Sequence, residues 1–298
     1  MRKWLKWTGG ALAALLLLGA AAVAVGLVLA ERRMARQVDV PMRPVAWGTD
    51  AQSLERGRYL FASRGCVDCH GADGAGKVFV DDGGGLRIKG PNITGGEGSA
   101  TAGYRPEDWV RSIRHGVAPG GRPLLVMPSE DYNRFTDEDL GAVVAYVRSL
   151  PPRPHGPAEI RLPVPARVMY GFGLMQDAAA KIDHSLPPQA PVPEGVSVAH
   201  GAYVANMCLG CHGPDLAGGR IPGAPPDWPP ASNLRPGAGA VLGAYPTGDD
   251  LKALFRTGRR PDGSPVKVMP FESLREMSDT DVQALHLYLR SLGPLPPG

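Results

Sequence analysis

The sequence predicts an all-α protein with one apolar N-terminal helix and two copies of a small helical domain. Residues 7–30 contain no charged side chain. A shift of 142 residues superposes residues 107–150 on 249–292 without a gap. In both copies apolar residues follow an N-cap at helical spacing. We therefore divide the chain into a membrane anchor (1–36), a first domain (37–152), a proline-rich linker (153–193) and a second domain (194–298).

The apolar N-terminal segment is long enough to cross a bilayer. As a helix its residues would extend about 36 Å, against a hydrocarbon core of about 30 Å. A cleaved signal peptide is the alternative, ending at Val28-Leu29-Ala30, but its apolar region is usually only about 7–15 residues. Flanking charge does not orient the segment, because basic side chains stand at both ends: Arg2, Lys3 and Lys6, then Arg32, Arg33 and Arg36.

Composition excludes several classes of protein. Residues 1–36 hold six basic side chains and one acidic one, whereas the rest of the chain has 26 basic and 28 acidic. The excess of basic over acidic side chains therefore lies in residues 1–36, and no nucleic-acid-binding surface is expected in the rest of the chain. No glycine-rich nucleotide motif follows a strand pattern. Only 6% of residues are aromatic and about a quarter are Gly or Pro, so a bulky cofactor is expected to help fill the interior.

All four cysteines lie in two copies of a Cys-x-x-Cys-His motif. This spacing is typical of c-type haem attachment. The two thiols add across the haem vinyl groups, and the adjacent histidine becomes the proximal iron ligand. We predict two covalently bound haem c groups, held by Cys66, Cys69 and His70 and by Cys208, Cys211 and His212.

Three alternatives to haem attachment are weaker. A zinc site built from both cysteine pairs would need ligands 139 residues apart, between Cys69 and Cys208, and would leave both histidines without a role. A pair of redox disulfides does not predict a histidine after each. Chance is improbable, since the chain has only seven histidines.

Met127 and Met269 are the predicted sixth ligands of the two irons. Each lies 57 residues after its motif histidine, and each precedes a proline. Histidine–methionine coordination raises the reduction potential and fills both axial positions. Methionine is also a common core gap-filler, which is the alternative for both. Met207 is set aside because it adjoins Cys208 and is held on the proximal side, and Met277 because it aligns with Phe135 in the repeat. The remaining histidines do not recur in the repeat and are expected at the surface or in caps: His115, His155, His184, His200 and His286.

Each copy has the same helical plan. A first helix carries a glycine and a tyrosine, and the glycine allows close crossing by the tyrosine-bearing last helix. Loops are expected over 71–105 and 213–247, followed by a middle helix near Glu107 or Asp249. The last helix begins after Thr136 or Ser278, each followed by acidic residues. Within the linker, residues 168–180 are expected to form one helix and the remainder an extended spacer.

The chain resembles tandem class I cytochrome c domains over residues 50–152 and 194–293. Residues 91–94, 109–116 and 136–151 look like the cytochrome subunits of bacterial membrane-bound alcohol and gluconate dehydrogenases. The resemblance implies that Asn92 and Asn233 contact haem; capping of a loop is the alternative for both. Those subunits usually carry three haems, whereas this chain has two motifs.

We therefore expect a membrane-anchored dihaem cytochrome that relays single electrons and is not itself an enzyme. Haem attachment outside the cytoplasm implies the bacterial inner membrane, with the haem domains facing the periplasm. Expected partners are a dehydrogenase and a terminal oxidase or soluble cytochrome. The alternative is a dihaem enzyme, such as a peroxidase or a thiosulfate-oxidising cytochrome, which would need an exchangeable or unusual ligand on one iron.

Overall fold

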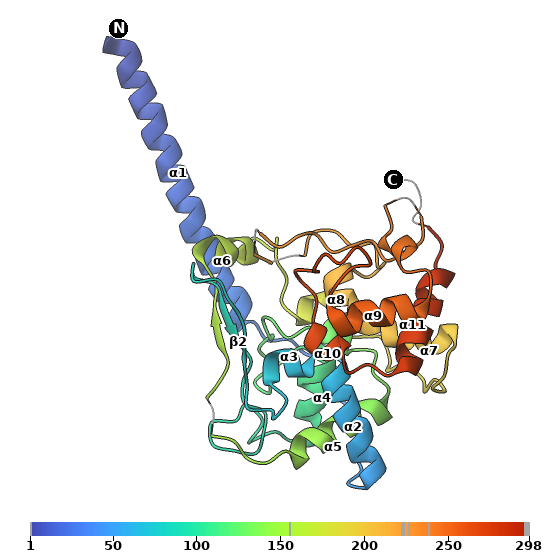
Figure 1. Ribbon diagram of the computed structural model, residues 1–298. Helices are drawn as coiled ribbons and strands as arrows, with labels where there is room; N and C mark the ends of the chain where they lie inside the picture. Colours follow the sequence, from blue (N-terminus) through green and yellow to red (C-terminus); the bar gives the residue numbers. More distant parts are fainter. Residues whose placement is uncertain (1, 155, 222–223, 226, 238, 295–298) are drawn as a thin grey trace.

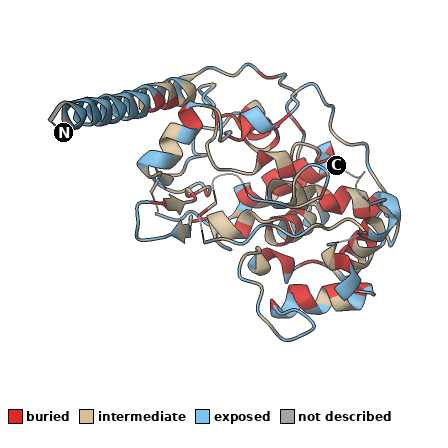
Figure 2. Cartoon of the chain, turned by 90° about the horizontal axis from the view of Figure 1, so that it is seen from above, coloured by how far each residue is buried: buried red, intermediate tan, exposed pale blue. Residues whose placement is uncertain are grey.

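The computed structural model describes residues 2–154, 156–221, 224–225, 227–237 and 239–294. A long helix, α1 (Arg2–Ala35), projects from a body built from the two repeats (Figure 1). It is long and apolar enough to cross a membrane by length and composition, and only 6% of its most apolar window is buried. The blue of exposed residues covers most of its length in Figure 2. A soluble core helix would instead be mostly buried.

The two domains have matching helices. In the first they are α2 (Ala51–Ser63), α3 (Cys66–His70), α4 (Pro106–His115), η1 (Ser129–Asp131) and α5 (Asp137–Ser149). In the second they are α7 (Val198–Ala205), η3 (Asn206–Cys208), α8 (Leu209–His212), η4 (Val241–Ala244), α9 (Gly248–Thr257), α10 (Phe271–Leu274) and α11 (Asp279–Ser291). The predicted middle and last helices are thus confirmed.

A glycine at the same place in each domain lets the first and last helices cross closely. A Cβ on Gly57 would lie 1.9 Å from the Ala142 carbonyl oxygen, and a Cβ on Gly201 would lie 2.0 Å from that of Ala284. Both positions therefore exclude a side chain. The predicted N-caps are also present, since Thr136 accepts a hydrogen bond from Asp139 N and Ser278 accepts one from Asp281 N.

The purely helical prediction is wrong in one region. A three-stranded antiparallel sheet is formed by β1 (Val78–Asp81), β2 (Arg87–Lys89) and β3 (Glu159–Arg161), in that order. The first two strands lie in the segment that we expected to be a loop. The third comes from the linker and pairs with β2 about 70 residues earlier in the chain. Strands of three or four residues leave little periodic signal.

The linker also differs from the prediction, because it packs against α1. Its helix α6 (Val164–Gly171) begins and ends earlier than expected, and residues 179–181 form a separate 3-10 turn, η2 (Ala179–Lys181). A Cβ on Gly171 would lie 2.0 Å from the Gly26 carbonyl oxygen. Figure 1 shows α6 crossing α1 where that helix meets the body.

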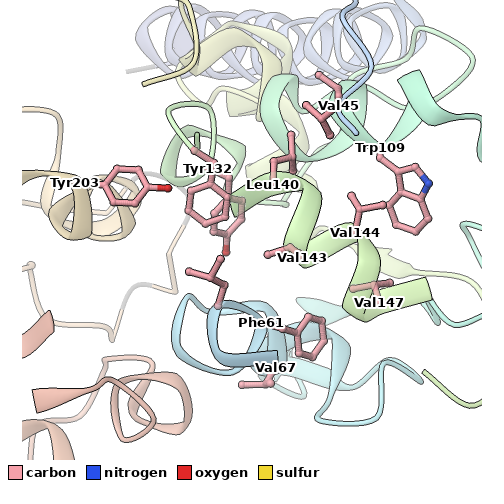
Figure 3. Close-up of a cluster of buried hydrophobic side chains, with 13 residues drawn as sticks. Val45, Phe61, Val67, Trp109, Tyr132, Leu140, Val143, Val144, Val147 and Tyr203 are labelled. Atoms are coloured by element: carbon pink, nitrogen blue, oxygen red, sulfur yellow. The ribbon is translucent and has the colours of Figure 1, made fainter. Parts of the chain in front are cut away.

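Each domain has its own hydrophobic core, and the two cores meet. The core of the first domain includes a residue of the second, Tyr203, whose ring centroid lies 6.4 Å from that of Phe135. Figure 3 shows Tyr203 reaching toward this cluster from the neighbouring domain. The second core surrounds Met277 and Leu285, both almost fully buried. The domains are thus packed together, not separated by an extended spacer.

Candidate functional site

Both Cys-x-x-Cys-His motifs end in a short helix whose last residue is the histidine, although Cys208 itself lies in the preceding turn η3. His70 Nδ1 lies 3.0 Å from the Pro91 carbonyl oxygen, and His212 Nδ1 lies 2.8 Å from that of Ser232. With a carbonyl as acceptor, Nδ1 carries the proton, so Nε2 is the nitrogen with a lone pair for a metal. A hydrogen bond of this kind is typical of metal-ligating histidines.

Burial sets the protonation states at both motifs. It lowers the pKa of His70 and His212, which favours the neutral imidazole that binds metal. It also raises the pKa of the thiols, to about 12 for Cys66 and Cys208. Redox-active Cys-x-x-Cys thiols have lowered pKa values instead. These surroundings therefore count against a redox disulfide.

The two candidate methionines stand in loops of identical construction. Met127 O accepts a hydrogen bond from Ser129 N at 2.8 Å, and Met269 O accepts one from Phe271 N at 2.8 Å. The proline that follows has φ −79° in both copies, with ψ 62° in the first and 64° in the second. Both methionines are partly buried and pack on the core of their own domain.

The remaining candidate ligands have different partners. His115 Nδ1 lies 3.1 Å from His184 Nδ1, and His200 Nε2 lies 2.7 Å from Asp281 Oδ1. His286 Nε2 lies 2.9 Å from the Tyr245 carbonyl oxygen. The last three candidates are Met277, which is fully buried in the second core, Met207, which packs on that core, and His155, which is outside the described residues.

Asn92 caps a loop. Its Oδ1 accepts hydrogen bonds from the backbone and hydroxyl of Thr94, both at 2.8 Å, and its Nδ2 donates to the Arg153 carbonyl at 2.7 Å. Asn233 is used in a similar way, because its Oδ1 accepts from Arg235 N at 2.9 Å. These bonds favour the capping role over haem contact at both positions.

The residues around the first motif fit a haem with its polar groups. Trp109 is buried in the first core, and its indole N–H has no protein hydrogen-bond partner. Such an orphaned donor suits an acceptor supplied by a cofactor. Among the residues that the structure describes, no three His, Cys, Asp or Glu side chains gather into a metal cluster.

A pair of tyrosines forms a reciprocal contact between the domains. Tyr59 of α2 donates to Asp281 Oδ2 at 2.6 Å and accepts from Ser278 N at 3.0 Å. Tyr203 of α7 donates to Asp139 Oδ2 at 2.6 Å and accepts from Thr136 N at 3.3 Å. Each tyrosine therefore binds the start of the last helix in the other domain. The interface has approximate twofold symmetry.

The motif helices themselves lie at this interface. Gly210 N, within the second motif, donates to Asp131 Oδ1 at 2.7 Å. Asp68, at the corresponding position of the first motif, accepts from Ser273 Oγ at 2.5 Å. Asp131 and Ser273 also correspond in the repeat. Each motif helix is thus held by the turn that follows the candidate methionine of the other domain.

Sequence reasoning missed these interface residues. Tyr59 and Asp281 are 222 positions apart, and helical periodicity carries no information about such pairs. The available signal was the repetition itself, since the same tyrosine follows the same glycine in both copies and the same aspartate lies three residues into both last helices.

Comparison with known proteins identifies the two domains separately. Residues 52–147 match the family described as cytochrome c oxidase, cbb3-type, subunit III, and residues 198–293 match the cytochrome c family. The gluconate 2-dehydrogenase cytochrome c subunit of Pantoea cypripedii is 30% identical over 80% of this chain and 59% of its own length. The fructose dehydrogenase cytochrome subunit of Gluconobacter japonicus is 28% identical over 92% and 59%. The chain therefore spans about three fifths of these relatives.

A quinone-dependent alcohol dehydrogenase cytochrome c subunit, from Gluconacetobacter polyoxogenes, is 29% identical over 83% of the chain and 58% of its own length. These matches agree with the duplicated motifs, the histidine geometry and the repeated helices. The chain therefore contains two cytochrome c domains in tandem.

Proposed function

We propose that the chain is a membrane-anchored dihaem cytochrome that relays single electrons as the cytochrome subunit of a membrane dehydrogenase. The observation that supports this most is the duplication of a complete candidate haem site. Both copies have a neutral histidine with Nδ1 bound to a loop carbonyl and a Met-Pro turn of the same construction. Both attachment helices lie at the domain interface.

The proposed ligand sets are Cys66, Cys69, His70 and Met127, and Cys208, Cys211, His212 and Met269. The cysteines would hold a haem covalently, and the histidine and methionine would be its protein ligands to iron. A bound haem of this type exchanges one electron with little other chemistry. With both a histidine and a methionine from the protein on each iron, no ligand position would be left for peroxide or another substrate. This coordination favours a relay over the peroxidase or thiosulfate-oxidising alternative.

The packed interface suits a relay within one chain. The contacts from Asp131 to Gly210 and from Ser273 to Asp68 fix both attachment helices against the neighbouring domain. A constant separation between two redox centres keeps the rate of exchange between them constant. An extended, flexible linker would not provide this.

We assign the relay to the periplasmic face of the inner membrane, with α1 as an uncleaved anchor. Haem is attached to such motifs outside the cytoplasm, so the body must be exported. Cleavage after Ala30 would also remove Gly26, against which α6 packs. A C-terminal alkaline phosphatase fusion should therefore be active, and the mature protein should retain its first residues.

The names of the relatives support a dehydrogenase as electron donor. A terminal oxidase or soluble cytochrome is the acceptor that we propose. Three of the relatives are named as cytochrome subunits of dehydrogenases for gluconate, fructose or alcohol. The soluble part of this chain is slightly acidic. A basic partner surface and a rate that falls with salt are therefore expected.

The ligand assignment is tested with purified full-length protein. Its mass under denaturing conditions should include two haems, and the oxidised protein should show a far-red sulfur-to-iron band. Met127→Ala and Met269→Ala should each remove about half of that band, whereas the core control Met277→Leu should leave it intact. An unchanged band in either alanine variant, or peroxidase activity in the unsubstituted protein, would favour the enzyme alternative.

A further inference from the structure

We propose that α6 and the turn after it lie in the surface of the bilayer and fix the orientation of the haem domains relative to the membrane. In the relay proposal α1 is only a tether. The surface contact rests on that proposal's assignment of α1 as the membrane span and adds a second membrane contact. Residues 164–174 are then covered by lipid.

The depth of α6 follows from its contact with α1. A Cβ on Gly26 would lie 2.8 Å from Val168 and 3.0 Å from the Phe172 ring. Gly26 is inside the uncharged segment, four residues before its end at Ala30. At about 1.5 Å per residue this is roughly 6 Å. Since the segment exceeds the hydrocarbon core by a similar length, the contact falls close to the boundary between hydrocarbon and headgroups.

Several apolar side chains of α6 and of the turn after it are exposed, although α6 packs on α1. The exposed fractions are 49% for Val164, 41% for Met169 and 48% for Phe172, and Leu174 just beyond is 71% exposed. Tyr170, on the packed side, is only 1% exposed. This pattern is typical of a helix that lies in the plane of a membrane surface.

Polar contacts hold α6 to the charged end of α1. Arg36 binds both carboxylate oxygens of Asp177, at 2.5 and 2.7 Å, and Tyr170 donates to the same carboxylate at 2.7 Å. Arg167 pairs with Glu31. The Arg33 guanidinium carbon lies 5.4 Å from the centroid of the Tyr170 ring. These contacts prevent the body from swivelling about α1.

The bilayer is the occupant that these observations favour. The exposed apolar side chains adjoin the membrane helix, because the Phe172 ring lies beside Gly26 within the apolar segment. A water-soluble partner could not reach that depth without displacing lipid. The apolar side chains would gain burial in the interface, where basic side chains such as Arg32 and Arg33 can face lipid phosphates.

The experiment uses full-length holoprotein in phosphatidylethanolamine–phosphatidylglycerol vesicles. Single cysteines replace Leu174, Leu16 or Gln52, and a membrane-impermeant maleimide measures their reactivity. Under the relay proposal the native thiols are consumed by thioether bonds, so the unsubstituted chain should not react. Leu16 is in the middle of α1, and Gln52 is exposed in the first turn of α2.

Leu174→Cys should react about tenfold more slowly than Gln52→Cys, although its side chain is exposed in the protein alone. A lipid-borne carbene label should also modify residues 172–174. If Leu16→Cys is protected and Leu174→Cys is as reactive as Gln52→Cys, the surface contact is wrong and the anchor stands. If Leu16→Cys is reactive, the anchor and the surface contact are both wrong. Protection of Leu174→Cys in native membranes but not in vesicles would contradict a lipid contact and indicate a protein partner.

Discussion

Asp139 and Asp281 occupy the same position in the two domains but have different surroundings. Asp139 is bound by Tyr203 and by Arg56, whose side chain is 28% exposed. Asp281 is bound by Tyr59 and His200 and also by Arg64, whose side chain is 2% exposed. In the repeat Asn206 stands in place of Arg64. Duplication has thus kept the geometry of the interface while one half acquired a buried charge pair.

The loops after the motifs show a second difference. The residue four positions after the motif histidine is in the left-handed region in both domains. It is a glycine in the first, with φ 71°, and Leu216 in the second, with φ 56°. Leucine disfavours this conformation, but Leu216 is buried in the second core and is only 3% exposed. Packing of the side chain therefore stabilises a left-handed backbone conformation in the second domain that a glycine adopts in the first.

The largest effect is expected from adding a side chain at the point where the first and last helices of a domain cross. Gly57→Ala or Gly201→Ala would put a methyl group within about 2 Å of a backbone oxygen, which packing alone cannot absorb. Each variant should unfold its own domain and lower the haem content from two per chain toward one. Mass spectrometry of tryptic haem peptides would show which domain is lost. Loss of both haems from either variant would mean that the domains do not fold independently.

Removal of the buried arginine should be the next largest effect. Arg64→Met leaves Asp281 buried without its cation and should cost about 3–5 kcal/mol in the free energy of unfolding. The matched change Arg56→Met, at a partly exposed pair, should cost about 1 kcal/mol. Urea unfolding of both variants measures the difference. Equal costs would show that the two halves of the interface are energetically alike.

The same asymmetry predicts a dependence on pH. Burial alone would raise the pKa of Asp281, but the charge of Arg64 and the hydrogen bonds from Tyr59, Arg64 and His200 lower it to about 2. Since the native state favours the charged carboxylate, its stabilisation is complete above about pH 5 and is lost as the pH falls toward 2. From an unfolded value of about 3.9, the loss is roughly 2.5 kcal/mol.

Urea midpoints measured between pH 5 and pH 2 test this dependence. Asp281→Asn should remove this part of the acid sensitivity, whereas Asp139→Asn in the other half should retain it. An unchanged pH profile in Asp281→Asn would assign the acid sensitivity to other carboxylates.

The smallest difference between the two halves is expected at the reciprocal tyrosines, where their contacts agree. Tyr59→Phe and Tyr203→Phe each remove one hydroxyl that donates to a carboxylate. Each should lower the free energy of unfolding by about 1.5–3 kcal/mol, less whatever a water molecule in place of the hydroxyl restores. Tyr203→Phe should approach the lower end, because its partner Asp139 is closer to solvent. Differential scanning calorimetry would detect both shifts, and the double variant should be close to additive if the contacts act separately.

Local patterns predicted the helices, their caps and both haem motifs, because the residues that define each of them lie close together in the sequence. Thr136 and Ser278 cap as expected, and Gly57 and Gly201 allow the expected crossings. The sheet and the fold of the linker were missed because β3 pairs with a distant strand and α6 packs on α1. The interface was missed for the same reason, since Arg64 and Asp281 are 217 positions apart.

The reciprocal tyrosine contacts have a consequence for how such a molecule can change over time. A surface that binds its own copy across a twofold axis is the surface of a homodimer. In a homodimer every substitution appears twice, so both halves must stay alike. Here the two halves are joined in one chain, and their pairing does not weaken on dilution. Each half can then change independently, as the difference between Arg64 and Asn206 at corresponding positions illustrates. Two identical electron carriers can in this way become two different carriers that act in a fixed order.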